Sequence, residues 1–348
     1  MKFIFLIIAL FTCLLTSCGS NSSSSSSQFL TGITYDTNSG KLIVLDFGQN
    51  IVQSVSALSG TATLTTLAGS SGTSGTTNST GTSAKFYGLQ GVVSDTSGNF
   101  FVSDLYNQVI RKITTPTSTA TVTTFAGTMS SSGSTDGTTT AAYFYNPRGL
   151  CIYSNIIYVA DSANHTIRSI TSSGLVTTLA GYAGTSGTTD GTSTAARFNY
   201  PNGVATDGTY IFVADTLNNS IRKINLTTYA VTTLAGSSSG ISGFTDSSTA
   251  SNARFNGPVG VATDGTYLYV TDYDNHAIRK IEISSGTVTT LAGSTSGVSG
   301  YVNATGTNAY FYYPLGITYY SGYLYITDQD GAHIRIVSTS SGATSTLY

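Results

Sequence analysis

The chain has 348 residues, of which 40% are hydrophobic and only 9% are charged, and its formal net charge at pH 7 is −2. Without a basic excess, the chain lacks the electrostatic attraction to phosphate backbones on which nucleic-acid binding depends. Its three cysteines exclude a framework of disulfides, so a packed hydrophobic core must stabilise the fold, and a chain of this length and composition can supply one.

Residues 1–17 have the pattern of a signal peptide. Lys2 is the only charged residue, an apolar run extends from Phe3 to Leu15, and the small residues Thr16 and Ser17 precede Cys18. The run is shorter than the roughly 20 apolar residues that a membrane-spanning helix needs. The pattern therefore predicts a cleaved export signal and not a transmembrane helix.

The four residues that end in Cys18, Leu-Thr-Ser-Cys, resemble the lipobox of bacterial lipoproteins. The resemblance implies that Cys18 becomes the lipidated first residue of a protein held at a bacterial membrane, in the periplasm or at the cell surface. Ordinary secretion is the alternative. Residues 18–28 are rich in serine and predict a flexible tether between the lipid and the domain that follows.

A pattern of four apolar segments occurs six times between residues 29 and 348. Each copy opens with a glycine that lies 54 to 59 residues after the one before it: Gly32, Gly91, Gly149, Gly203, Gly260 and Gly316. The second segment of each copy ends in aspartate: Asp46, Asp104, Asp161, Asp215, Asp272 and Asp328. Seven residues later, every copy except the first has an arginine: Arg111, Arg168, Arg222, Arg279 and Arg335. A period of this size indicates repeated supersecondary units.

Segments rich in Val, Ile, Thr and Tyr, separated by turn signals such as Asp207-Gly208, predict four short strands in each copy. One such antiparallel meander cannot bury its apolar faces alone, whereas six meanders around an axis cover one another. We therefore expect an all-β fold, a six-bladed β-propeller in which each blade is a four-stranded antiparallel meander from one repeat. Blades one and six should close the ring by packing side to side. The expected blades are about 29–69, 86–127, 144–181, 198–236, 255–293 and 311–348.

The stretch from Val213 to Ile224 resembles the NHL repeat, since Val-Ala-Asp is followed by Asn-x-x-Ile-Arg-Lys-Ile, and the resemblance extends over all six copies. It implies the propeller fold and says little about function. Some NHL-type propellers are peptide-amidating lyases, whose zinc histidines look to lie between the Pro and Gly that open first strands. No histidine occupies that position here, where the chain has Gln90, Arg148, Asn202, Val259 and Leu315.

The recurring charged residues predict hydrogen bonds that hold each blade together. They are Asp104, Arg111, Asp161, Arg168, Asp215, Arg222, Asp272, Arg279, Asp328 and Arg335. In the connectors between blades, Asp136 and Asp190 each precede a glycine and are expected only to turn the chain. A phenylalanine near the end of each connector is expected to pack between blades: Phe86, Phe144, Phe198, Phe255 and Phe311. Cys151 matches alanines of other copies, which predicts a small interior residue.

Residues that depart from the repeat are the candidates for ligand binding. The connectors are about 20 residues long and share one face of the ring with the turns between second and third strands, and long loops on a rigid scaffold often bind ligands. On or near that face, the candidates are Arg148, Asp274, His276, Tyr312, Tyr313, Asp330 and His333. A metal site would need Asp272, Asp274, His276, Asp328, Asp330 and His333 to converge. We otherwise expect no metal, no cofactor and no catalytic residue.

The sequence favours an interaction protein over an enzyme. We expect a monomeric, membrane-anchored scaffold outside the cytoplasm, attached to lipid through Cys18, whose long-loop face binds a protein or glycan and not nucleic acid. The alternative is a metal-dependent lyase or hydrolase that acts at the central mouth of the propeller. A structural envelope or adhesive protein is the third class of function that the sequence allows.

Overall fold

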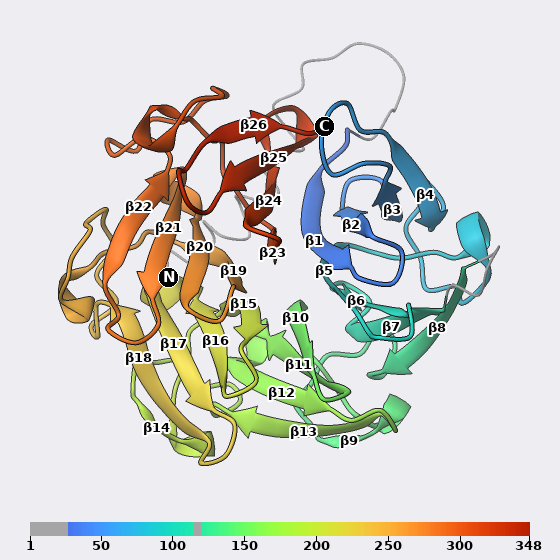
Figure 1. Cartoon of the computed structure of the whole chain (residues 1–348). Coiled ribbons are helices and arrows are strands. Elements are labelled where there is room, and N and C mark those ends of the chain that lie inside the picture. The colour runs from blue at the N-terminus through green and yellow to red at the C-terminus, as the bar shows by residue number, and fades with distance from the viewer. Residues whose placement is uncertain (1–26, 115–119) are drawn as a thin grey trace, which may run out of the picture.

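The computed structural model describes residues 27–114 and 120–348, which form a ring of six β-sheets around a central axis (Figure 1). The predicted six-bladed β-propeller is confirmed. The expected signal peptide at 1–17, the lipidation site Cys18 and most of the tether at 18–28 lie outside the described residues. Within the described ranges, no helix has the length and apolar character needed to cross a membrane.

Each blade consists of consecutive antiparallel strands that follow one another from the axis to the rim. Blade one consists of β1 (Leu30–Asp36), β2 (Lys41–Asp46), β3 (Ile51–Val55) and β4 (Leu64–Ala68). Blade two consists of β5 (Leu89–Ser94), β6 (Phe100–Asp104), β7 (Val109–Thr114) and β8 (Thr121–Ala126). Blade three consists of β10 (Pro147–Tyr153), β11 (Ile156–Asp161), β12 (Thr166–Ile170) and β13 (Leu175–Ala180). Blade four consists of β15 (Pro201–Thr206), β16 (Tyr210–Asp215), β17 (Ser220–Asn225) and β18 (Ala230–Gly236). Blade five consists of β19 (Pro258–Thr263), β20 (Tyr267–Asp272), β21 (Ala277–Glu282) and β22 (Val288–Ala292). Blade six consists of β23 (Ile317–Tyr320), β24 (Tyr323–Asp328), β25 (His333–Ser338) and β26 (Thr344–Thr346).

Blades three and four have a fifth strand, which the sequence did not predict. The two-residue strands β9 (Gly137–Thr138) and β14 (Gly191–Thr192) come from the connectors that precede these blades and pair with β13 and β18. Blades two, five and six have a single bridge at the same place. The outermost strand of a blade has unpaired backbone groups, and the connector satisfies some of them. Short 3-10 turns complete the connectors and the turns between second and third strands: η1 (Gly81–Ser83), η2 (Thr139–Ala141), η3 (Ser162–Asn164), η4 (Ser193–Ala195), η5 (Thr216–Asn218), η6 (Ala250–Asn252), η7 (Tyr273–Asn275), η8 (Gly306–Asn308) and η9 (Asp330–Ala332).

The six repeated glycines line the axis, where neighbouring blades meet backbone to backbone. A Cβ atom at Gly203 would lie 2.3 Å from the carbonyl oxygen of Val259, and one at Gly316 would lie 2.1 Å from that of Thr31. The other four glycines have the same relation to the next blade. Glycine therefore recurs in every repeat because any larger residue would push the blades apart.

The phenylalanine of each connector fills the space between two blades, as predicted. Phe198, for example, is fully buried and belongs to a cluster that includes Ile167 and Ala180 of blade three and Val204 and Ile211 of blade four. The other four connector phenylalanines are buried in equivalent clusters. The core of the protein is thus divided into layers between blades.

The contact between blades six and one differs from the other five. Its apolar cluster contains Leu347 near the end of the chain and no phenylalanine. The rings of Tyr35 and Tyr320 stack with centroids 3.6 Å apart, and Thr327 Oγ1 donates a hydrogen bond of 2.7 Å to the carbonyl of Thr31. Both sheets keep only their own strands, so the ring closes by side-to-side packing, as predicted.

Candidate functional site

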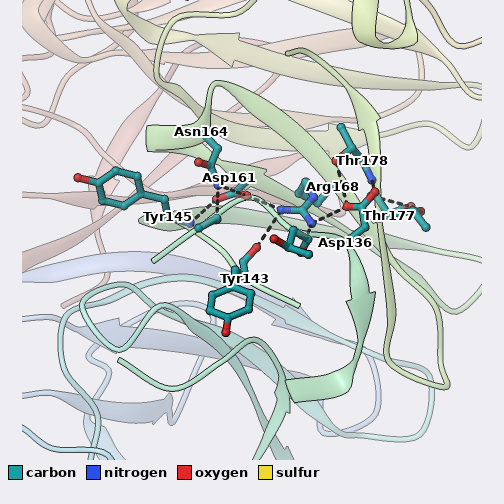
Figure 2. A network of polar contacts seen from close by, with 11 residues as sticks. Asp136, Tyr143, Tyr145, Asp161, Asn164, Arg168, Thr177 and Thr178 are labelled. Carbon is teal, nitrogen blue, oxygen red and sulfur yellow. Dashed lines mark hydrogen bonds and ion pairs between the residues drawn. The ribbon is translucent and has the colours of Figure 1, made fainter. Parts of the chain in front are cut away.

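A buried ion pair organises each of blades two to six, and blade three illustrates it (Figure 2). Arg168 NH1 donates to Asp161 Oδ2 over 2.7 Å, and both side chains are fully buried. The same carboxylate accepts hydrogen bonds from the backbone N–H of Tyr145 and from Asn164 Nδ2. Burial raises the pKa of Asp161 to about 6, while Arg168 and Asn164 act to lower it. The network ties the second and third strands of the blade to its connector.

The connector aspartates do more than turn the chain, so the interpretation of Asp136 and Asp190 was wrong. Arg168 NH2 lies 2.6 Å from Asp136 Oδ1, and the Asp136 carboxylate also accepts from the backbone and hydroxyl of Thr178 (Figure 2). Asp190 holds Arg222 in the same way. The equivalent residues in the other blades are Asn78, Asp246 and Asn303. Each arginine therefore bridges a buried carboxylate and an acceptor in the preceding connector.

A second repeated contact joins neighbouring blades. After each strand-ending aspartate of blades one to five, the fourth residue has a positive φ and presents a side-chain acceptor to the backbone N–H of the next blade. His165 Nδ1 accepts from the N–H of Tyr200, and His276 Nδ1 accepts from that of Tyr313, each over 3.1 Å. The other three residues are Asn50, Gln108 and Asn219, which accept from Gly88, Asn146 and Gly257. We call these five hydrogen bonds the blade clasps.

The clasps account for the alternation of Asn, Gln and His at this position, because all three have a neutral acceptor of similar reach. His333 lies one position further along in blade six and makes a different contact. Its Nδ1 is 2.9 Å from the carbonyl oxygen of Tyr348, and its ring stacks on Tyr301. His276 and His333 thus have structural contacts in this fold.

The histidine clasps should make stability fall in mild acid. Burial lowers the pKa of both His165 and His276. A histidine in the unfolded chain, with a pKa of about 6.5, then binds a proton more readily than the same histidine in the folded chain. The histidine clasps therefore stabilise the fold fully above about pH 6.5, and this stabilisation is lost as the pH falls through the lower pKa of the folded state. We expect the melting temperature of the native protein to fall further between pH 7 and pH 5 than that of the His165→Asn, His276→Asn double variant.

Asparagine is the matched control for these clasps, since Asn50 and Asn219 occupy the same position in other blades. The buried aspartates, whose raised pKa contributes with the opposite sign, are common to both proteins and cancel in the comparison. Equal pH dependence of the two melting temperatures would show that the histidines do not accept hydrogen bonds as neutral side chains.

A cavity of about 590 Å³ lies on the loop face. We call it the mouth cavity. It is bordered by the first residues of innermost strands, by turns between second and third strands, and by a connector. Its polar lining includes Arg148, Tyr200, Asn202, Asn219, Asn256, Tyr273 and Asp274, and its apolar lining includes Leu217, Ile241, Val259 and Leu315. On the axis, the ring of glycines lines a smaller cavity of about 70 Å³. Residues further along the innermost strands line another cavity of about 230 Å³.

Two of the predicted ligand-binding residues, Arg148 and Asp274, line the mouth cavity. Burial lowers the pKa of the Arg148 guanidinium, opposed by the phenols of Tyr106, Tyr200 and Tyr273. Burial raises the pKa of Asp274. The cavity wall therefore contains one cation and one carboxylate, both partly removed from water.

The remaining candidates lie at different places. The ring of Tyr313 contacts those of Tyr273, His276 and Tyr312, with centroids 4.8, 4.4 and 4.9 Å apart, so these aromatic residues form one group beside the cavity. His333 is not part of the cavity lining, and Asp330 begins η9. Sequence reasoning missed Tyr200 and Tyr273. Tyr200 had a signal, because it lies two residues after its connector phenylalanine, as Tyr313 does.

No metal centre is evident in residues 27–114 and 120–348, where no three His, Cys, Asp or Glu side chains lie close enough to hold an ion. Cys151 is buried, as expected for a small interior residue, and burial raises the pKa of its thiol. A thiol in that environment is protonated at neutral pH, which does not suit a nucleophile.

The comparisons with known proteins agree with the repeat and the fold. The NHL repeat family matches residues 144–168. NHL repeat-containing protein 2 from Bos taurus is 33% identical over 166 residues, which are 42% of this chain and 22% of that protein. The chain thus spans about a fifth of the length of this relative.

Solved structures share the architecture at low sequence identity. An auxiliary nutrient binding protein from Bacteroides thetaiotaomicron is 15% identical, with a TM-score of 0.65 over 93% of this chain and 70% of that one. A catalytically inactive virginiamycin B lyase from Staphylococcus aureus is also 15% identical, with a TM-score of 0.54 over 94% and 87%. These likenesses concern the fold, which hosts both binding and lyase activity. The chain is thus a six-bladed β-propeller in which residues 144–168 match the NHL repeat.

Proposed function

We propose that this propeller is a binding protein outside the cytoplasm, held at a bacterial membrane by lipid on Cys18, which takes its ligand in the mouth cavity. Residues 1–17 would be the export signal, residues 18–28 the tether, and residues 29–348 the monomeric binding domain. The observation that carries the proposal is the mouth cavity itself, whose 590 Å³ lies within the range of ligand sites.

The construction of the cavity supports ligand binding. Its walls come from four neighbouring blades, three to six, whose relative positions are held by clasps and phenylalanine layers. Binding to such a rigid site requires little ordering of the protein, which favours affinity. The lining combines apolar side chains with a small number of polar ones, the mixture that orients a bound molecule.

The long-loop face also favours an external ligand. Gly240 and Ile241 belong to a connector, and Ile241 is exposed where it borders the mouth cavity. The Bacteroides thetaiotaomicron structure with the same architecture is described as nutrient binding, which is compatible with this use of the fold. The ligand classes that we consider are a glycan and a peptide segment of a protein.

A variant with a filled cavity tests the proposal. Leu217 lines the mouth cavity and is only partly buried, so Leu217→Trp should occupy the space without displacing the core. On arrays of glycans and peptides, we expect the purified protein to bind at least one ligand and Leu217→Trp to bind it at least about tenfold more weakly, since the ligand loses its contact area.

The matched control lies on the opposite face, where Tyr153 ends β10 and is exposed. Tyr153→Ser should bind as the native protein does. If all three proteins bind equally, the mouth cavity is not the site, and if none binds any probe, the proposed function is wrong. Metal analysis of the same preparations separates this proposal from the metal-dependent lyase or hydrolase, which requires a stoichiometric ion.

A further inference from the structure

We infer that the mouth cavity takes an acidic saccharide, a sugar unit with a carboxylate, which Arg148 contacts through its guanidinium while the Tyr200 and Tyr273 rings pack against the sugar. This inference rests on the proposed function and specifies the ligand of the same site. Three independent features of the cavity support it: the backbone at Tyr200, the mixture of groups in the wall, and the balance of charge.

The backbone at Tyr200 is held in a conformation that favours glycine. Its φ is 50°, and the position two residues after the connector phenylalanine has a positive φ in all of blades two to six, where the other four residues are Gly88, Asn146, Gly257 and Tyr313. A bulky residue in this region is uncommon, because its Cβ atom is crowded by the backbone, and such residues concentrate at ligand sites. The chain thus tolerates backbone strain where a tyrosine ring reaches the cavity.

The Tyr200 ring is also fixed in orientation. Its backbone N–H donates to His165, and its ring meets the His165 imidazole edge to face with centroids 4.7 Å apart. Tyr273 is held similarly, because its hydroxyl donates to Gln329 Oε1 over 3.2 Å and its ring contacts Tyr313. Rigid tyrosines provide contact area at a low entropy cost, and their amphipathic rings suit a ligand with both C–H faces and hydroxyl groups.

The polar groups of the wall suit sugar hydroxyls. The amides of Asn202 and Asn256 can each donate and accept, and the Asp274 carboxylate can accept. Apolar side chains, among them Leu217 and Val259, complete the lining. A pyranose ring presents hydroxyl groups around its edge and C–H groups on its faces, so it can use both kinds of contact at once.

The charges select an acidic sugar and orient it. Arg148 is the only cation among the described residues that line the cavity, and Asp274 is the only carboxylate. A guanidinium can bind a carboxylate through two parallel hydrogen bonds, so Arg148 suits the carboxylate of an acidic sugar. Asp274 repels anions from its own side of the cavity. One cation balanced by one carboxylate suits a ligand with a single negative charge better than a phosphate dianion.

Calorimetric titration with methyl galacturonoside, which has one carboxylate, and with the neutral methyl galactoside tests the inference. The purified protein should bind methyl galacturonoside at least about tenfold more tightly than methyl galactoside at low salt, because a charge-assisted pair is lost with the neutral sugar. Arg148→Met should remove this preference. Lys41→Met, which removes an exposed cation at the start of β2, should retain it. Tyr200→Gly, a residue that other blades have at this position, should weaken both sugars about equally.

The outcomes separate this inference from the proposed function. Equal affinity for both sugars, or a preference that survives Arg148→Met, overturns the role of the carboxylate and leaves the binding site. If the protein binds neither sugar but binds a peptide, and Leu217→Trp removes that binding, the inference of a saccharide ligand is wrong and the mouth cavity remains the binding site. Melting curves of each variant confirm that the fold is retained.

Discussion

Arg168→Met should lower the free energy of unfolding by about 3–5 kcal/mol, the range observed when one partner of a buried ion pair is removed. Without the guanidinium, the Asp161 carboxylate stays fully buried with only the N–H of Tyr145 and the amide of Asn164 as donors. The carbonyl oxygens of Tyr143 and Thr135 also lose the hydrogen bonds that they accept from Arg168. Urea denaturation followed by circular dichroism measures the change.

Two further variants make the result interpretable. Asp136 is about half exposed at the other end of the network, and Asp136→Asn introduces the amide that blade two has at Asn78, so its effect should stay below about 1 kcal/mol. Adding Asp161→Asn to Arg168→Met removes the uncompensated charge and should restore part of the stability. If Arg168→Met unfolds at the urea concentration of the native protein, the network does not stabilise the blade.

Phe198→Ala should destabilise the protein by about 3–5 kcal/mol, as for other large-to-small changes in cores. Phe198 is fully buried between blades three and four, and its ring also lies under Arg222, with the guanidinium carbon 5.2 Å from the ring centroid. The change leaves a cavity that the backbone-to-backbone contact of the blades at the axis prevents from collapsing. Thermal and urea denaturation both measure the loss.

Two control variants accompany Phe198→Ala, one at the same position and one at an exposed ring. Phe198→Leu retains most of the volume and should have a smaller effect. Tyr229→Ala removes an exposed ring outside the layer between the blades, and it should change stability by no more than about 0.5 kcal/mol. A loss as small for Phe198→Ala as for Tyr229→Ala would mean that the interblade layer does not depend on the phenylalanine.

The fold could be predicted from the sequence because the residues that determine it recur once in each blade. Gly203 at the axis has counterparts in all the other repeats, and Asp215 at the end of a second strand and Phe198 in a connector meet the same surroundings as their counterparts in the rest of blades two to six. The short added strands β9 and β14 could not be predicted from the sequence. Whether a connector runs close enough to a blade edge to pair with it depends on the packed ring.

The candidate site was readable only in part. Arg148 and Asp274 stood out because they break the repeat, and both line the mouth cavity. The aromatic residues that share the site, Tyr200 and Tyr273, could not be chosen from among the 23 tyrosines by composition. Their position depends on the angle between adjacent blades.

By itself, the sequence determined the number of blades, the order of their strands and the residues that bury between them, since these follow from local strand patterns and a repeat that every blade shares. The tertiary structure alone decided that His165 and His276 clasp the next blade, that Asp136 completes an arginine site, and that four blades border a cavity. The physical reason is that these contacts join residues that are 32 or more positions apart in the chain and come together only when the blades and connectors have packed.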